Sequence, residues 1–276
     1  MKYRIMIETT NICNASCPFC SNHLLKRKKM IMSNDIFEII IRRIIEEKID
    51  IEKFILHLNG EPFTDPNLIE RVSRLKKTFP EALISFTTNL SLASKDTIDQ
   101  IFMCGLDAIT VSLNAIDEKQ YNEIMGLDYK NTMMKLDYLI ERNSELNKKL
   151  NISVSLVEKG NKEDVDIFVD KYKNKADVRI LHMGNWIGSD NEVEYIGNRV
   201  IVSKNSCADL NEQICILSNG DFAICCFDSE GSVGLNVKNH SLLAAFNSKT
   251  YTDLRKKLSM NGTKGTICET CSFSYS

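Results

Sequence analysis

The stretch that decides the fold is IETTNICNASCPFC, residues 7–20, which carries Cys13, Cys17 and Cys20 on a short loop after a β-like segment. Structural zinc takes four ligands, and His23 is the nearest candidate for the fourth. A thioredoxin-like pair would use Cys17 and Cys20 and leave Cys13 idle. A cubane iron–sulfur cluster held by three thiolates leaves one iron open for an outside ligand. The residues of this loop leave all three alternatives open.

The composition excludes several classes of partner. Lysine and arginine number 35 against 37 acidic residues, so the net charge is −2 and no overall field attracts nucleic acid or an anionic membrane. The first residues do not resemble a signal peptide, and no apolar run is long enough to span a bilayer. We therefore expect a cytoplasmic protein. In a reducing compartment, its ten cysteines point to metal binding or catalysis rather than disulfides.

Strand and helix patterns alternate between two groups of cysteines. The predicted strands are 3–8, 53–58, 83–88, 107–113, 152–157 and 178–182, and the predicted helices are 33–47, 67–78, 94–104, 117–125, 129–147 and 163–172. Six such units predict an α/β fold, a partial (β/α)6 TIM-like barrel, with its chemistry at the carboxyl ends of the strands. We expect this core over residues 1–182, a connecting segment over 183–206 and a small module over 207–276. In the module, Asn219-Gly220 between two apolar runs predicts a hairpin, followed by helices over 241–247 and 250–260.

The first cysteine group resembles the signature of the radical S-adenosylmethionine (SAM) superfamily, a strand followed by CxxxCxxC with an aromatic residue, here Phe19, before the third cysteine. The resemblance implies that Cys13, Cys17 and Cys20 hold a [4Fe–4S] cluster whose open iron binds SAM. Such a cluster cleaves SAM to a 5′-deoxyadenosyl radical that takes a hydrogen atom from a substrate. The cofactor carries out the difficult chemistry, and the protein positions the reactants and excludes water.

Later motifs extend the resemblance over residues 3–182. Asn59-Gly60-Glu61-Pro62 is similar to the family's GGE motif, in which the backbone and the Glu61 carboxylate receive the ammonium group of SAM. Asn59 replaces the first glycine of that motif, and Leu90 replaces the glycine of a TNG-like motif. The resemblance assigns SAM binding to Phe19, Asn59, Gly60, Glu61, Asn89, Ser112 and Asn114. Each motif taken alone also fits an ordinary turn or a satisfied polar residue at a strand end.

The second cysteine group is similar to the auxiliary-cluster module called SPASM or, in its shorter form, Twitch. The resemblance implies that a second [4Fe–4S] cluster is held by Cys207, Cys225, Cys268 and Cys271. Because the sequence ends at Ser276, we expect the Twitch form with one auxiliary cluster. Structural zinc with four cysteine ligands is the alternative. We expect Cys215 and Cys226 to be packing residues, with Cys226 on the hairpin face opposite Cys225.

These features favour a radical SAM oxidoreductase that dehydrogenates a small polyol, sugar or aminocyclitol, the auxiliary cluster accepting an electron. The alternatives are a maturase that modifies a peptide by crosslinking, thioether formation or epimerisation, and a non-catalytic iron–sulfur electron-transfer protein. Because the core strand begins at Tyr3, we expect no peptide-recognition domain before it. A flavodoxin or ferredoxin is the expected electron donor. His182 is a candidate general base, with a buried core histidine as the alternative. Residues 26–29, KRKK, are expected to be a solvated charge run rather than a patch that steers an anionic substrate.

Overall fold

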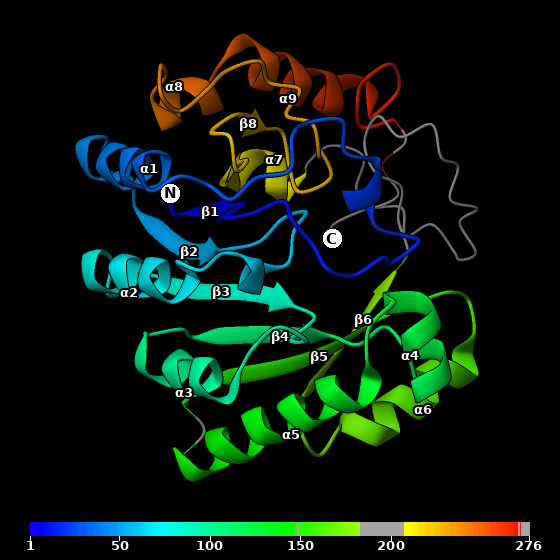
Figure 1. Cartoon of the computed structure of the whole chain (residues 1–276). Helices are drawn as coiled ribbons and strands as arrows, with labels where there is room; N and C mark the ends of the chain where they lie inside the picture. Colours follow the sequence, from blue (N-terminus) through cyan, green and yellow to red (C-terminus); the bar gives the residue numbers. More distant parts are fainter. Residues whose placement is uncertain (148, 183–206, 270, 272–276) are drawn as a thin grey trace.

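Six parallel strands form the core of the computed structural model, which describes residues 1–147, 149–182, 207–269 and 271 (Figure 1). These strands are β1 (Tyr3–Ile7), β2 (Ile51–Ile55), β3 (Leu83–Thr88), β4 (Ala108–Ser112), β5 (Asn151–Glu158) and β6 (Asp177–His182). They lie side by side in sequence order within an eight-stranded sheet, β6-β5-β4-β3-β2-β1-β7-β8. The predicted partial (β/α)6 barrel is confirmed. The expected connecting segment, 183–206, lies outside the described residues.

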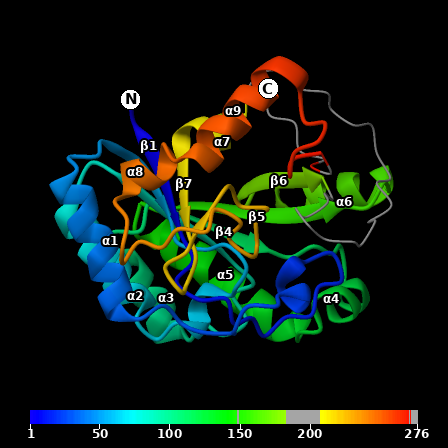
Figure 2. The ribbon, with the colours of Figure 1, turned by 90° about the horizontal axis from the view of Figure 1, so that it is seen from above.

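Helices lie between successive strands and cover one face of the sheet, as α1 to α5 do in Figure 2. They are α1 (Asn34–Glu46), α2 (Leu68–Thr78), α3 (Lys95–Met103), α4 (Glu118–Met125), α5 (Tyr129–Glu145) and α6 (Lys162–Tyr172), with 3-10 turns η1 (Ser21–Leu24) and η2 (Pro62–Thr64). Local sequence sets their ends. Ser33 and Ser94 accept hydrogen bonds from backbone N–H groups in the first turns of α1 and α3, and Gly105 follows α3 at φ +89°. No described helix is long and apolar enough to cross a membrane.

The two faces of the sheet differ in polarity. Along β3, β4 and β5 one set of alternate residues belongs to the main hydrophobic cluster: Ile84, Phe86, Ile109, Val111, Ile152 and Val154. The other set is buried and polar: Ser85, Thr110, Ser153 and Ser155. Parallel strands covered on both faces are ordinarily apolar throughout. Serine and threonine on the inner face therefore indicate a lining for polar ligands or water.

The C-terminal module extends the same sheet. It comprises α7 (Ala208–Glu212), β7 (Gln213–Ile216), β8 (Phe222–Ala223), α8 (Leu242–Phe246) and α9 (Lys249–Asn261). β7 and β8 are antiparallel, which confirms the predicted hairpin, and α8 and α9 correspond to the two predicted helices. β7 also pairs in parallel with β1, with Ile5 opposite Ile214. Neither this pairing nor α7 was indicated by the sequence pattern.

Strand β2 departs most from its predicted bounds. It spans Ile51–Ile55 rather than 53–58. The reason lies in β3, where the backbone N–H of Thr87 donates to Nδ1 of His57 at 3.0 Å. A side chain therefore occupies the donor that a longer β2 would have used, and the ladder ends early.

A buried ion pair joins the core to the module. Arg27 donates to both carboxylate oxygens of Glu8, at 2.5 and 2.6 Å. Arg27 also donates to the carbonyl of Ser229 at 2.6 Å and to the hydroxyl of Ser218 at 3.3 Å, and the backbone N–H of Ser218 donates to Glu8 at 3.0 Å. The side chain of Arg27 is 9% exposed and that of Glu8 is fully buried. The expectation of a solvated run is therefore wrong for Arg27, because the carboxylate at the end of β1 draws the guanidinium inward.

Asn59 and Glu47 complete this attachment. The side-chain oxygen of Asn59 accepts hydrogen bonds from Ser21 at 2.8 Å and Ser229 at 3.2 Å, and its amide nitrogen donates to Glu8 at 3.2 Å. Farther along the module, the carboxylate of Glu47 accepts the first two backbone N–H groups of α8 at 2.8 and 2.7 Å. The module is thus attached to the core by backbone pairing, charge and a helix cap.

Replacing Arg27 by methionine should destabilise the protein by about 3 to 5 kcal/mol, because the carboxylate of Glu8 would stay buried without its counter-charge. Lys28→Met is the matched control, since the side chain of Lys28 is exposed. Anaerobic denaturant unfolding of both variants measures the difference. Equal unfolding midpoints for the two variants would contradict this role of the ion pair.

Candidate functional site

A cavity of about 430 Å³ lies at the carboxyl ends of the core strands. Most site residues predicted from the first cysteine group and the later motifs line it: Cys13, Cys17, Phe19, Cys20, Gly60, Glu61, Asn89, Ser112 and Asn114. They come from the loops after β1, β2, β3 and β4, which are separate in sequence and adjacent in the sheet. This is where catalytic groups gather in barrels of this type.

The cysteine loop surrounds its sulfur atoms with donors. The backbone N–H of Ala15 lies 3.4 Å from Sγ of Cys13, and that of Asn22 lies 3.4 Å from Sγ of Cys20. Burial raises the pKa values of these two thiols, and the ammonium group of Lys29 opposes part of that rise. Donors and positive charge of this kind favour thiolate, the form that binds metal.

Burial nevertheless dominates the ionisation of these thiols. It raises the pKa values of Cys13 and Cys20, and it raises the pKa of Cys17 to about 12, with the neighbouring Cys20 and Cys13 adding to the effect. A metal ion or cluster supplies the positive charge that would offset this cost. Among the described residues, no three His, Cys, Asp or Glu side chains already lie close enough together to hold a metal ion. The fit to an iron–sulfur cluster therefore rests on three thiols that share one cavity and on their donors.

Glu61 is a buried carboxylate in the same cavity. It accepts hydrogen bonds from the hydroxyl of Thr88 at 2.5 Å, the backbone N–H of Asn89 at 2.7 Å and the backbone N–H of Phe63 at 3.1 Å. Burial raises its pKa to about 7, against the opposing effect of these hydrogen bonds. None of the ion pairs found among the described residues involves it, so its charge is available to a ligand that carries N–H donors.

Gly60 lets two loops meet. The backbone N–H of Glu61 donates to the carbonyl of Ile12 at 2.9 Å, beside the first cysteine. A β-carbon at Gly60 would lie 2.2 Å from the carbonyl oxygen of Thr10 and 2.9 Å from that of Ile12. Only glycine allows this approach, and both contacts are to backbone atoms, which cannot move aside cheaply.

The strand-end residues are held by local hydrogen bonds. Asn89 donates through its side chain to Asn14 at 2.9 Å, and Asn114 accepts from the backbone N–H of Val157 at 3.1 Å. Ser112 lies 3.4 Å from the hydroxyl of Ser155. Leu90, which replaces a glycine of the related motif, has φ +63° although its side chain is fully buried. The backbone at this position thus retains the conformation that favours glycine.

Asn59 lies apart from the other predicted residues. It is not among the residues that line the cavity, and its side chain serves the network around Glu8 and Arg27. A glycine could not make these contacts. The departure from the GGE motif therefore coincides with a structural link to the C-terminal module.

The second cysteine group comes together from three segments. The thiol of Cys268 lies within electrostatic range of Cys207, Cys225 and Cys271, and burial, followed by these neighbours, raises its pKa to about 12. The backbone N–H of Phe227 lies 3.4 Å from Sγ of Cys225. Four cysteine thiols suit iron–sulfur or zinc equally well by their chemistry, although among the described residues they do not lie at metal-ligand spacing.

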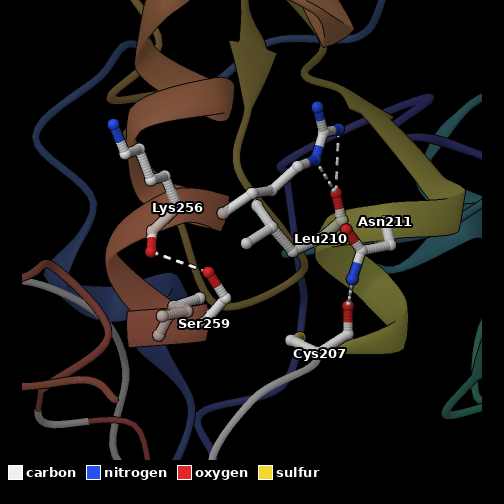
Figure 3. A pocket seen from close by; sticks show the side chains of 7 residues that line it. Cys207, Leu210, Asn211, Lys256 and Ser259 are labelled. Atoms are coloured by element: carbon white, nitrogen blue, oxygen red, sulfur yellow. Dashed lines mark hydrogen bonds between the residues drawn. The ribbon is translucent and has the colours of Figure 1, made fainter. Parts of the chain in front are cut away.

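Figure 3 shows how Cys207 is positioned beside a second cavity, of about 420 Å³, between α7 and α9. The side-chain amide of Asn211 donates to the carbonyl of Cys207 at 2.9 Å. Arg255 on α9 donates twice to the carbonyl of Leu210, at 3.1 and 3.0 Å. Helix α9 therefore holds the short helix that begins just after Cys207.

The remaining cysteines of the hairpin differ from each other. Cys215 is fully buried against Met6 and Ala223, as a packing residue should be. Cys226 is half-buried, and it lines the first cavity together with Phe227. Cys225 belongs to the main hydrophobic cluster, whereas Cys226 packs against a separate cluster that contains Cys215, which agrees with the expectation that the two neighbours face opposite sides of the hairpin. The hairpin thus presents a wall to the cavity.

Several lining residues were not among the predicted ones. His57, Met125, Val157 and Leu181 line the same cavity. Alternation along β2 would have placed His57 on the inner face, but this signal does not distinguish a structural residue from a functional one. His182 ends β6 as predicted, opposite Glu158, and its side chain lies outside the described part of the structure.

Two family models match the chain. The radical SAM superfamily model matches residues 7–171, and SPASM, described as an iron–sulfur cluster-binding domain, matches residues 207–272. The chain is 27% identical over 186 residues to GTP 3′,8-cyclase of Clostridium perfringens (strain SM101 / Type A), which covers 65% of this chain and 54% of that protein. The match thus spans about half the length of this curated relative.

Solved structures share the fold. BtrN, crystallised with AdoMet and 2-DOIA, superimposes with a TM-score of 0.63 at 17% identity, over 98% of this chain and 93% of BtrN. SuiB of Streptococcus suis, bound to its precursor peptide SuiA, gives a TM-score of 0.62 at 18% identity, over 99% of this chain and 70% of SuiB. At these identities the likeness extends to the fold alone.

Replacing Gly60 by alanine should reduce both stability and the iron retained after anaerobic reconstitution, because the new methyl group would force the Glu61 turn away from the loop that leads into Cys13. Gly234→Ala is the control: its methyl group would meet nothing within 4 Å, so it carries only the ordinary backbone cost at φ +73°. Iron analysis and thermal unfolding check both variants. Iron retention in Gly60→Ala at the level of the control would show that the close approach is dispensable.

Proposed function

Because the chain belongs to the radical SAM superfamily and carries a SPASM iron–sulfur cluster-binding domain, we propose that it oxidises a small polyol, sugar or aminocyclitol to a carbonyl compound. It is a radical SAM enzyme, and its cofactors are SAM, the [4Fe–4S] cluster that binds SAM, and auxiliary iron–sulfur chemistry in the SPASM domain. When bound, these groups supply a 5′-deoxyadenosyl radical, which removes the hydrogen atom on the carbinol carbon, and an acceptor for the second electron. The hydroxyl proton leaves to a base, so that one C–H and one O–H bond are lost and one C=O bond forms.

The residues divide this work between them. We assign Cys13, Cys17 and Cys20 to the SAM-binding cluster and Cys207, Cys225, Cys268 and Cys271 to one auxiliary cluster, which is the Twitch arrangement. Glu61 receives the amino group of SAM, and Gly60, Asn89, Ser112 and Asn114 form the rest of its site with Phe19. His182 remains the candidate base.

One observation carries the proposal. The cavity that contains the first three cysteines is also lined by Cys226 and Phe227, which directly follow Cys225. A substrate in this cavity would touch the SAM site and the segment that holds the auxiliary cluster at the same time. An electron left on the substrate therefore has an acceptor close by, as an oxidation requires.

The comparison with BtrN agrees with a small-molecule substrate. BtrN, whose structure contains AdoMet and 2-DOIA, matches over nearly the whole length of both proteins. The second candidate is modification of a peptide, which the match to SuiB with its bound precursor peptide favours. A passive electron carrier would have no use for a cavity with Glu61 between the two cysteine groups.

The test is anaerobic purification of the wild type and of a variant with Cys13, Cys17 and Cys20 all changed to alanine. We expect about eight irons per wild-type chain, from two four-iron clusters, and about half in the variant. Only the wild type should form 5′-deoxyadenosine from SAM and a reductant such as reduced flavodoxin. Cys104→Ala is the control, because Cys104 is buried at the carboxyl end of α3 and belongs to neither cysteine group. Zinc in place of iron, or no 5′-deoxyadenosine, would refute the proposal.

Deuterated candidates separate the two substrate classes. Polyols and aminocyclitols deuterated at the carbinol carbon, 2-deoxy-scyllo-inosamine among them, should transfer deuterium into 5′-deoxyadenosine. Transfer from peptides instead would establish the second candidate.

The affinity for SAM should depend on pH through Glu61. With a pKa of about 7, the carboxylate is protonated below that pH and must lose its proton to accept an N–H of SAM. The affinity of the wild type relative to Glu61→Gln should therefore fall by up to about tenfold per unit as pH decreases below 7, and level off above it. Protonation of SAM itself affects both affinities equally, so it cancels in the ratio. Equilibrium binding of SAM from pH 5.5 to 8.5 measures this ratio of affinities. Glu163→Gln is the control, because Glu163 is exposed. A ratio that stays constant with pH would contradict the role of Glu61 in binding SAM.

A further inference from the structure

His57 stands on the inner face of the sheet, just beyond β2. Its neighbours Phe54 and Leu56 are fully buried in the main hydrophobic cluster on the helix side. Alternation along the strand places His57 on the opposite side, where it lines the first cavity. None of the expected roles in cluster or SAM binding uses it.

Hydrogen bonding determines which ring nitrogen of His57 carries the proton. Nδ1 accepts the backbone N–H of Thr87 at 3.0 Å, so its lone pair is occupied. Burial, together with the charge of Lys53, lowers the pKa of His57 to about 4, and the ring is neutral at ordinary pH. The single ring proton must then lie on Nε2. With both nitrogens so engaged, His57 can donate a hydrogen bond but has no free lone pair to act as a base.

The donor on Nε2 has no acceptor within the described residues, because the bond from Thr87 is the sole hydrogen bond found for His57 there. Around it the cavity is largely apolar, with Met6, Leu58 and Phe227 among the lining side chains. Among the described residues, Nε2 of His57 is not one of the buried polar atoms that lack a partner, so it opens to the cavity, where water or a ligand can supply the acceptor.

We propose that Nε2–H of His57 donates a hydrogen bond to an oxygen of the substrate and so positions the carbon that is oxidised. This inference rests on the proposed function and names a group for its substrate site. The acceptor is a hydroxyl oxygen, which becomes the carbonyl oxygen of the product and accepts in both states. A peptide carbonyl has the same acceptor chemistry, and the deuterated polyols and peptides distinguish the two sources.

Two substitutions separate this role from support of the fold. In His57→Asn, the side-chain oxygen can replace Nδ1 as the acceptor for Thr87, but the donor toward the cavity is lost. In His57→Gln, the longer amide can present a donor near the position of Nε2. Both variants should bind two clusters and cleave SAM without substrate at the wild-type rate.

With the candidate compound that most increases 5′-deoxyadenosine formation by the wild type, His57→Asn should raise KM or lower kcat/KM about tenfold, and His57→Gln should recover part of the loss. Equal kcat/KM in His57→Asn and wild type would overturn the proposal. The proposal would also be overturned if SAM cleavage without substrate fell by as much as kcat/KM, because His57 would then serve the cofactor or the fold.

The tautomer gives a readout that needs no substrate. Nitrogen-15 solid-state spectra of frozen holoenzyme with oxidised clusters contain signals from only four histidines, and subtraction of the His57→Asn spectrum assigns one of them. A protonated Nε2 supports the proposal, and a protonated Nδ1 overturns it. Should the wild type form no 5′-deoxyadenosine, the proposed function fails, while this spectrum still decides the state of His57.

Discussion

The ion pair between Glu8 and Arg27 is the interaction on which the arrangement of the two cysteine groups depends. Glu8 follows β1 directly, Arg27 follows the cysteine loop, and both contact Ser218 in the turn of the C-terminal hairpin. Because the pair is buried, breaking it would leave a charge in a medium that solvates it poorly. The loop that carries the first cysteines and the hairpin that carries Cys225 are therefore held to the same point.

This attachment explains why one cavity serves both halves of the chain. The pairing of β7 with β1 makes the module a continuation of the barrel sheet rather than a separate body beside it. Cys226 and Phe227 then line a space that the core alone would leave open. The hydroxyl groups of Thr87, Thr88 and Ser112 and the carboxylate of Glu61 line the same space and suit it to a cofactor with N–H and hydroxyl groups.

The site shows how electrostatic cost and function are linked. Three half-buried thiols and one buried carboxylate share one cavity, and their desolvation raises the pKa of each. A protein without ligands gains nothing from such an arrangement, since every one of these groups resists ionisation there. An iron–sulfur cluster and SAM offset the cost with positive charge and donors. Nε2–H of His57 opens to the same cavity, and a substrate oxygen is its proposed acceptor.

The sequence by itself determined the parts that depend on local spacing. The positions of Cys13, Cys17 and Cys20, the alternation of strands and helices, and the hairpin at Asn219-Gly220 all follow from neighbours within a few residues. The motifs containing Glu61 and Asn89 could be read in the same way, because the carboxyl ends of parallel strands meet at one edge.

Only the tertiary structure decided which distant groups meet. Arg27 looked like part of a solvated run because its partner lies nineteen residues away in sequence and on another element. In the sequence, Asn59 was only a departure from the first glycine of the GGE motif, and its hydrogen bond with Ser229 appears only in the structure. The tautomer of His57 likewise follows from its hydrogen bond with the backbone of β3. Burial and charge pairing depend on what packs across the sheet, and a one-dimensional pattern contains no record of those contacts.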